Sequence, residues 1–151
     1  MNWKVGETAV LFGWRSMTVD IDLAADPEPA GLFEAIAKIK DQHSVNVELA
    51  SPADFIPELP GWRDRCLFIA RHGEVDFYHY DPYAQALAKI ERGHARDRLD
   101  VNEMIDRGLV ERIQLLDLFQ RIENKLIRFP SIDPNHLRAE VRRLCRERGE
   151  T

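Results

Sequence analysis

Residues 15–23 read RSMTVDIDL, and this stretch decides the fold prediction because it places two carboxylates on one face of a short apolar strand. Three apolar residues of the stretch alternate with Asp20 and Asp22. Side chains alternate between the two faces of a strand, so one face can enter a core while the other carries only negative charge. The Cα atoms of the two aspartates then lie roughly 7 Å apart, which lets both carboxylates reach hard cations.

Two like charges on one strand face call for a counter-ion. Magnesium fits because it prefers oxygen ligands, needs only one or two protein carboxylates and fills its other positions with water and substrate phosphate oxygens. The alternative is a surface strand whose outer face is acidic. The spacing of Asp20 and Asp22 alone leaves both interpretations open.

The composition predicts an ordinary globular protein. With 151 residues the chain is long enough for one domain with a real core. Cys66 and Cys145 have no metal-ligand spacing, so we expect free thiols in a reducing cytoplasm. No apolar run reaches membrane-spanning length, and a net charge of -5 argues against a strongly basic nucleic-acid platform.

Hydrophobic periodicity predicts a mixed first half and a helical second half. We expect a first strand that alternates over residues 19–23 and is broken at residues 26–29, and further strands over 44–50, 66–70 and 75–80. We expect helices over 32–40, 82–92, 97–107, 110–126 and from 134 onward. The proline-rich residues 51–62 should form a packed loop held by Phe55, Ile56 and Trp62. The fold class is therefore α+β, with an α/β core over residues 1–80 and a helical part over 81–151 packed on it as one compact unit.

Further acidic and glycine positions strengthen the magnesium hypothesis. Gly6 lies upstream of Asp20 and Asp22 at a distance that suits a phosphate-cradling turn. Glu48 lies on the outer face of the next predicted strand. Three acidic side chains can then converge at one sheet edge.

These residues carry a family resemblance. GETA at residues 6–9, followed by GWRSMTVDIDL at residues 13–23, resembles the signature of nucleotidyltransferase-fold (DNA polymerase beta-like) proteins. The chain is similar to bacterial nucleotidyltransferase-like proteins and to the toxins of type IV toxin-antitoxin systems. The resemblance implies that the glycine turn at Gly6 holds a triphosphate, and that Asp20, Asp22 and a third carboxylate, Glu48, bind two magnesium ions. It also implies a nucleotidyltransferase-like mixed sheet followed by a helical C-terminal part.

A second stretch, ALAKIERGHARDRLDV at residues 86–101, resembles the downstream lysine and Arg-Asp-x-x-Asp element of the same proteins. It implies that Lys89 contacts a nucleotide phosphate, although an exposed helix lysine is the alternative. Asp97 and Asp100 share a helix face and either orient Lys89 or serve as a helix cap and surface charge. Arg15 either steadies the triphosphate or balances the acidic strand.

The resemblance implies a magnesium-dependent transferase that moves a nucleoside monophosphate from an NTP to an acceptor such as RNA, protein or a small molecule. A protein partner or antitoxin and a homodimer are further expectations. Glu7 stands where relatives carry Gly or Ser, and only five residues precede Gly6, so the helix leading into that turn should be short or absent. Because Glu7 puts a negative charge beside the expected triphosphate, the alternative is a catalytically inactive binding or regulatory protein of the same fold. A structural partner that dimerises through its helical half is a third possibility.

Two other patterns admit two interpretations each. Tyr78, His79 and Tyr80 offer either a stacking face for a base or core packing at a strand end. The arginine-rich last helix either contacts RNA or presents a solvated face.

Overall fold

The computed structural model describes residues 2–5, 12–14, 20–26, 30–43, 46–73 and 75–146. The chain divides into two compact units that are interleaved along the sequence. The sheet unit spans Met1–Ser51 and Cys66–Tyr80, and the helical unit spans Pro52–Arg65 and Asp81–Thr151. The chain therefore passes from one unit to the other after Ser51, Arg65 and Tyr80.

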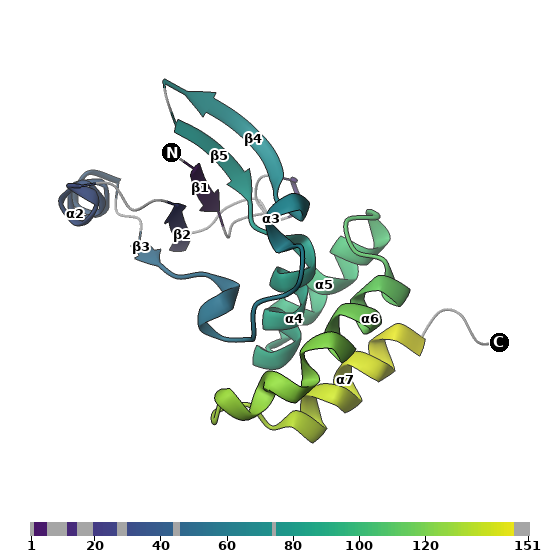
Figure 1. The fold of residues 1–151 in the computed structure, drawn as a ribbon. Helices are drawn as coiled ribbons and strands as arrows, with labels where there is room; N and C mark the ends of the chain where they lie inside the picture. Colours follow the sequence, from purple (N-terminus) through teal and green to yellow (C-terminus); the bar gives the residue numbers. More distant parts are fainter. Residues whose placement is uncertain are drawn as a thin grey trace. The chain divides into compact units, whose positions relative to one another are not determined.

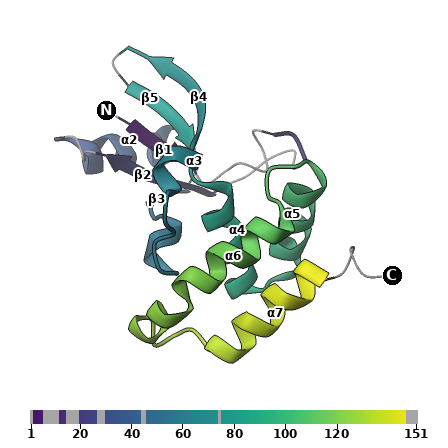
Figure 2. The same ribbon diagram turned by 45° about the vertical axis from the view of Figure 1, so that its right-hand side comes forward.

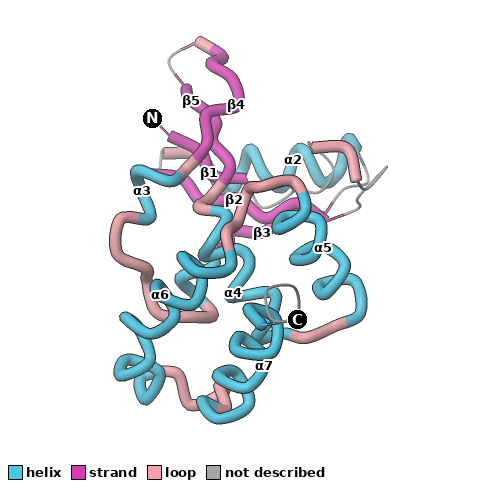
Figure 3. The backbone as a smooth tube through the Cα atoms, turned by 90° about the vertical axis from the view of Figure 1, so that its right-hand side faces the viewer, coloured by secondary structure: helices cyan, strands magenta, loops and turns pink. Residues whose placement is uncertain are grey.

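The sheet unit is built on a five-stranded sheet of order β3-β2-β1-β5-β4 (Figure 1; magenta in Figure 3). The strands are β1 (Asn2–Val5), β2 (Asp20–Asp26), β3 (Asn46–Leu49), β4 (Leu67–His72) and β5 (Val75–His79). β2 is parallel to β3 and antiparallel to β1, while β5 is parallel to β1 and antiparallel to β4. The sheet is mixed, which confirms the predicted α+β fold class.

The central strand β1 was absent from the sequence prediction. Its four residues are too few to show a hydrophobic period, and its strand conformation depends on pairing with β2 on one side and β5 on the other. The other four strands lie close to their predicted positions, and β2 ends at Asp26, where the break was expected.

Helix α2 (Leu32–His43) connects the parallel strands β2 and β3, as a parallel pair requires a crossover. It contacts β3, and Leu32 and Ile36, one turn apart, are the buried residues among its described side chains. Phe33 of the predicted apolar stripe is instead 69% exposed.

Strands β4 and β5 form an antiparallel hairpin whose turn includes Gly73 at a φ of 63°. Such a positive φ favours glycine because a Cβ atom would clash with the backbone. At the end of β5, His79 and Tyr80 are 6% and 5% exposed, so the core-packing alternative holds for these two aromatic residues.

The helical unit packs around α4 (Pro82–Arg92), which contacts α5, α6, α7, η1 and α3 (Figure 2). These elements are η1 (Pro52–Asp54), α3 (Trp62–Arg65), α5 (Ala95–Asp106), α6 (Arg112–Ile122), η2 (Glu123–Arg128) and α7 (Pro134–Arg146). Helices α6 and α7 lie side by side. The core includes Leu87, Met104, Leu115 and Val141, all fully buried. No helix in the described part of the chain is both long and apolar enough to cross a membrane.

Capping residues delimit α4 as the sequence predicts. Asp81 is the N-cap and accepts a 3.0 Å hydrogen bond from the Tyr83 amide, while Pro82 occupies the first turn. Gly93 ends the helix in the left-handed region at a φ of 72°.

Other helix boundaries differ from the prediction. Helix α5 begins at Ala95, two residues earlier than expected, with His94 as its N-cap. The expected helix over residues 110–126 is divided into α6 and the 3-10 segment η2. The sequence did not predict this division, because helical periods of 3.0 and 3.6 residues cannot be told apart over so few residues.

The proline-rich segment before the hairpin is packed, as predicted, and Ile56 is one of the predicted residues that hold it. Ile56 and Leu59 are 1% and 2% exposed. Phe55, which was expected to hold the segment, is 54% exposed, so that expectation was wrong. Apolar character alone does not show which of two adjacent residues, Phe55 or Ile56, faces a core.

Candidate functional site

The backbone of the sheet unit brings the three predicted metal ligands together. In the parallel register, Asp22 pairs with Glu48, and Asp20 lies two residues before Asp22. Residues two apart on a strand, and residues directly opposite on neighbouring strands, belong to the same face of a sheet. Positions 20, 22 and 48 therefore share one face. Gly6 and Arg15, the predicted triphosphate contacts, lie outside the described residues.

This donor set fits a hard divalent cation. Asp22 and Glu48 are directly opposite each other on neighbouring strands, and such strands lie about 4.8 Å apart. Carboxylate oxygens are ligands that magnesium prefers. The described side chains, which do not include those at 20, 22 and 48, contain no other group of three His, Cys, Asp or Glu residues able to hold a metal ion.

The predicted helical residues form ion pairs across the α4–α5 connection. Lys89 of α4 donates a 2.9 Å hydrogen bond from Nζ to Oδ2 of Asp100 in α5. The Asp100 side chain is 3% exposed and that of Lys89 is 16% exposed. Asp100 thus holds the Lys89 ammonium, which is the orienting contact that the resemblance implies.

Asp97 has a different set of partners. It accepts two hydrogen bonds from Arg92, at 2.8 and 2.5 Å, and one from the backbone amide of His94 at 3.2 Å. Burial by itself raises the pKa of Asp97, but the hydrogen bonds and charge of Arg92 and the His94 amide outweigh burial, so the pKa lies below its ordinary value. Asp97 is thus an ionised carboxylate in the first turn of α5 that accepts a hydrogen bond from the N-cap amide of His94, which is the capping alternative.

Arg92 was missed by the sequence prediction. It lies at the end of α4, and Asp97 lies three residues after the N-cap of α5, with Gly93 and His94 between the two helices. A basic residue just before a helix-ending glycine and an acidic residue in the next first turn are the signals that could have indicated this pair.

A second buried network, also missed, surrounds Asp81. Arg65 of α3 donates to both carboxylate oxygens of Asp81, at 3.1 and 2.7 Å, and the Asp81 side chain is fully buried. Tyr83 continues the network, because its hydroxyl donates to Oε1 of Gln114 and accepts from the Glu111 amide, each at 3.0 Å. The network ties α3, α4 and α6 together within the helical unit.

The predicted site residues thus fall into two sets. Positions 20, 22 and 48 belong to the sheet unit, and Lys89, Asp97 and Asp100 belong to the helical unit. Within each unit the structure brings the predicted residues together.

A mixed sheet with an Asp-x-Asp strand is followed by helices that carry a lysine–aspartate pair, which is the α+β arrangement that the resemblance to nucleotidyltransferases implies. The comparison with known families agrees, because residues 5–141 match the family described as "Nucleotidyltransferase of unknown function (DUF6036)". The chain belongs to this family. No curated protein and no solved structure matched the chain in the corresponding comparisons.

Proposed function

We propose that the protein is a magnesium-dependent nucleotidyltransferase that moves a nucleoside monophosphate from an NTP to an acceptor. One observation carries the proposal: in a chain of a nucleotidyltransferase family, the β2–β3 register sets Glu48 opposite Asp22, two residues from Asp20. A face with three neighbouring carboxylates needs cations, and a triphosphate needs them too.

Each residue of the proposed site has a stated role. Asp20, Asp22 and Glu48 hold two magnesium ions, which when bound neutralise the triphosphate and lower the pKa of the acceptor. Glu48 also helps to take the proton from the attacking oxygen. Gly6 contacts the triphosphate through its backbone.

Two positive side chains are the proposed phosphate contacts. Arg15 and Lys89 contact phosphates, with the Lys89 ammonium held by Asp100. The acceptor oxygen bonds to the α-phosphorus while the bond from that phosphorus to the bridging oxygen breaks, so pyrophosphate leaves. Asp97 supports the helical element through Arg92 rather than by contact with the nucleotide.

The acceptor is RNA, protein or a small molecule, and the similarity to type IV toxins supports a cytoplasmic role with an antitoxin partner. The test is transfer from each of four NTPs, radiolabelled at the α-phosphate, onto total RNA and total protein, with magnesium or with EDTA. We expect label on one acceptor class in the presence of magnesium only.

Variants make this test specific. Asp20→Asn and Asp22→Asn should lower transfer by at least about a hundredfold, because each removes a metal-binding charge. Asp41→Asn, at an exposed position of α2, is the matched control and should keep full activity. Full transfer by Asp20→Asn would refute the proposal.

Glu7 supports one rival function, an inactive member of the fold that binds or regulates. Its negative charge beside the expected triphosphate opposes nucleotide binding. Calorimetry of NTP with and without magnesium separates the two functions, since tight magnesium-dependent binding counts against the rival. If Glu7 is what prevents binding, Glu7→Gly should restore it.

A further inference from the structure

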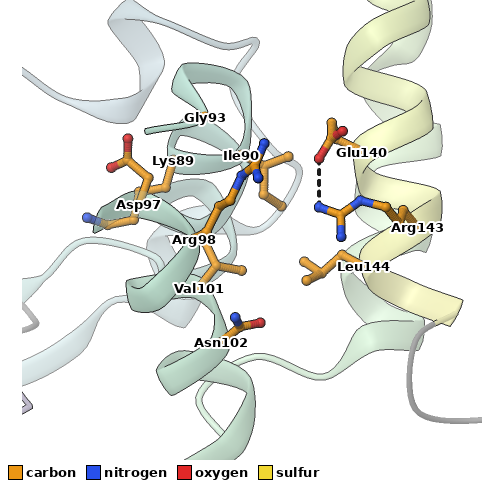
Figure 4. A pocket seen from close by; sticks show the side chains of 10 residues that line it. All are labelled: Lys89, Ile90, Gly93, Asp97, Arg98, Val101, Asn102, Glu140, Arg143 and Leu144. Atoms are coloured by element: carbon orange, nitrogen blue, oxygen red, sulfur yellow. Dashed lines mark hydrogen bonds and ion pairs between the residues drawn. The ribbon is translucent and has the colours of Figure 1, made fainter. Parts of the chain in front are cut away.

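A small pocket opens in the helical unit between α4, α5 and α7 (Figure 4). Its volume is about 110 Å³. Val101 and Leu144, which are 2% and 9% exposed, point toward each other across it, and Ile90 adds a third apolar wall. Sites for drug-sized ligands measure roughly 300–1,000 Å³, so the occupant of this pocket is about the size of one ring system.

The rim of the pocket combines donors and acceptors. Arg98 and Asn102 come from α5, and Glu140 and Arg143 come from α7. In Figure 4 the Arg98 guanidinium extends toward Glu140, which accepts a 2.8 Å hydrogen bond from Arg143. Among the described residues, the Arg98 side chain has no hydrogen-bond or ion-pair partner, so its donors are available to a ligand.

Glu140 stays ionised at neutral pH. The hydrogen bond from Arg143 holds the pKa of Glu140 below its ordinary value, and the charge of Arg98 acts in the same direction. The other charged lining groups pair with residues beside the pocket, Lys89 with Asp100 and Asp97 with Arg92. The rim thus offers guanidinium donors, a carboxylate acceptor and an amide that does both.

This combination selects one class of ligand. An inorganic anion would meet the carboxylates of Glu140 and Asp97, and a wholly apolar molecule would bury guanidinium groups without partners. A flat heterocycle with donors and acceptors on its edge satisfies both requirements, since its faces contact the apolar walls and its edge meets the rim. Arginine, asparagine and glutamate are side chains that read base edges.

We propose that this pocket binds a nucleobase. The inference goes beyond the proposed function, because it uses none of the carboxylates at positions 20, 22 and 48. The base has two sources, a free nucleoside or a single-stranded nucleic acid. Arg146 lies exposed on α7, three residues after Arg143 of the rim, so phosphates beside a bound base would contact it only if the base belongs to a strand.

The test is calorimetry and methyl NMR on the full chain in EDTA, with the four nucleosides, ribose 5-phosphate and a short single-stranded oligonucleotide as probes. We expect at least one nucleoside to bind and to shift the methyl signals of Val101 and Leu144, and ribose 5-phosphate not to bind. Arg98→Ala and Asn102→Ala should each weaken nucleoside binding about tenfold. Arg142→Ala is the matched control and should not change it.

Three results would overturn the inference: no nucleoside binds, ribose 5-phosphate binds as tightly as a nucleoside, or Arg98→Ala and Asn102→Ala leave nucleoside affinity unchanged. If the base belongs to a strand, Arg146→Ala weakens oligonucleotide binding but not nucleoside binding; if it is free, neither changes. Asp20→Asn should leave nucleoside binding in EDTA intact. Loss of transfer and loss of base binding therefore report on separate proposals.

Discussion

Asp81 combines a buried ion pair with a helix cap in the helical unit. Its fully buried carboxylate binds Arg65 and caps α4 through the Tyr83 amide. Asp81→Ala removes the cap and leaves a partly buried guanidinium without its acceptor, so we expect the free energy of unfolding to fall by about 3 kcal/mol. The measurement is the midpoint of urea unfolding, compared between proteins whose unfolding free energy has the same dependence on urea concentration.

Asp117→Ala on α6 is the control for Asp81→Ala. Asp117 pairs with Arg121 at 3.0 Å, but both side chains are more than half exposed. Solvent screens such a pair, so its loss should cost less than about 0.5 kcal/mol. Equal effects of the two substitutions would contradict the importance assigned to burial.

His79 makes the stability of the sheet unit depend on pH. It is 6% exposed, its ring lies 4.8 Å from that of Phe12, and burial lowers its pKa below the ordinary value of 6.5. The unfolded chain then binds more protons than the folded one, so stability is complete above the unfolded pKa and falls as the pH drops below it.

The test of this dependence compares urea midpoints from about pH 7.5 down to about pH 5.5. We expect the wild-type midpoint to decrease and the decrease to be smaller in His79→Phe, which cannot titrate. Asp97 and Glu140 do not interfere, since their pKa values lie below the ordinary 3.8 and 4.5. Parallel curves for the two proteins would exclude His79 as the cause.

At the scale of elements, the Lys89–Asp100 pair joins α4 to α5. Lys89→Met leaves the Asp100 carboxylate buried without this cation, so we expect a loss of about 2 kcal/mol in the free energy of unfolding. Lys89→Met combined with Asp100→Leu should recover part of that loss, because it removes both charges. Urea unfolding of the two single variants and the double variant gives the coupling energy.

The double variant also separates structure from chemistry. If it is stable but does not transfer nucleotide, the lysine charge acts on phosphate. If Lys89→Met is as stable as wild type, the pair makes no net contribution to the connection between α4 and α5.

Local signals explain which elements the sequence could predict. Asp81, Pro82 and Gly93 delimit α4 through caps that depend only on neighbouring residues. Strand β1 and the split of α6 from η2 carry no such signal, because one depends on its partner strands and the other on a subtle change of helical period. The acidic positions of β2 and β3 were predictable from alternation, and their register confirms that they share a face.

At the scale of the whole molecule, sequence reasoning found the change from strands to helices at residue 80 but not the interleaving of the units. Segment Pro52–Arg65 belongs to the helical unit although it precedes the hairpin in sequence. Its membership depends on Ile56 and Leu59 in the helical core and on the bond between Arg65 and Asp81, all of them contacts between distant residues. No local pattern predicts such contacts.

Because segment Pro52–Arg65 belongs to the helical unit, we expect the C-terminal helices not to fold without it. Residues 81–146 alone lose the two buried side chains of Ile56 and Leu59, worth about 1.5–3 kcal/mol each, and the partner of Asp81. Since whole domains are stable by only about 5–15 kcal/mol, this fragment should lack a cooperative thermal transition.

Restoring the missing segment should restore folding. Because Arg65 and Asp81 are hydrogen-bonded, a Gly/Ser linker of about four residues can replace the hairpin between them. We expect residues 52–65, the linker and residues 81–146 to melt cooperatively in far-UV circular dichroism, and Ile56→Asp in this fusion to abolish the transition. A fragment 81–146 that melts at the same temperature as the fusion would show that segment 52–65 lies on the helices without stabilising them. A fusion that does not fold would instead show that the helical unit needs the sheet unit.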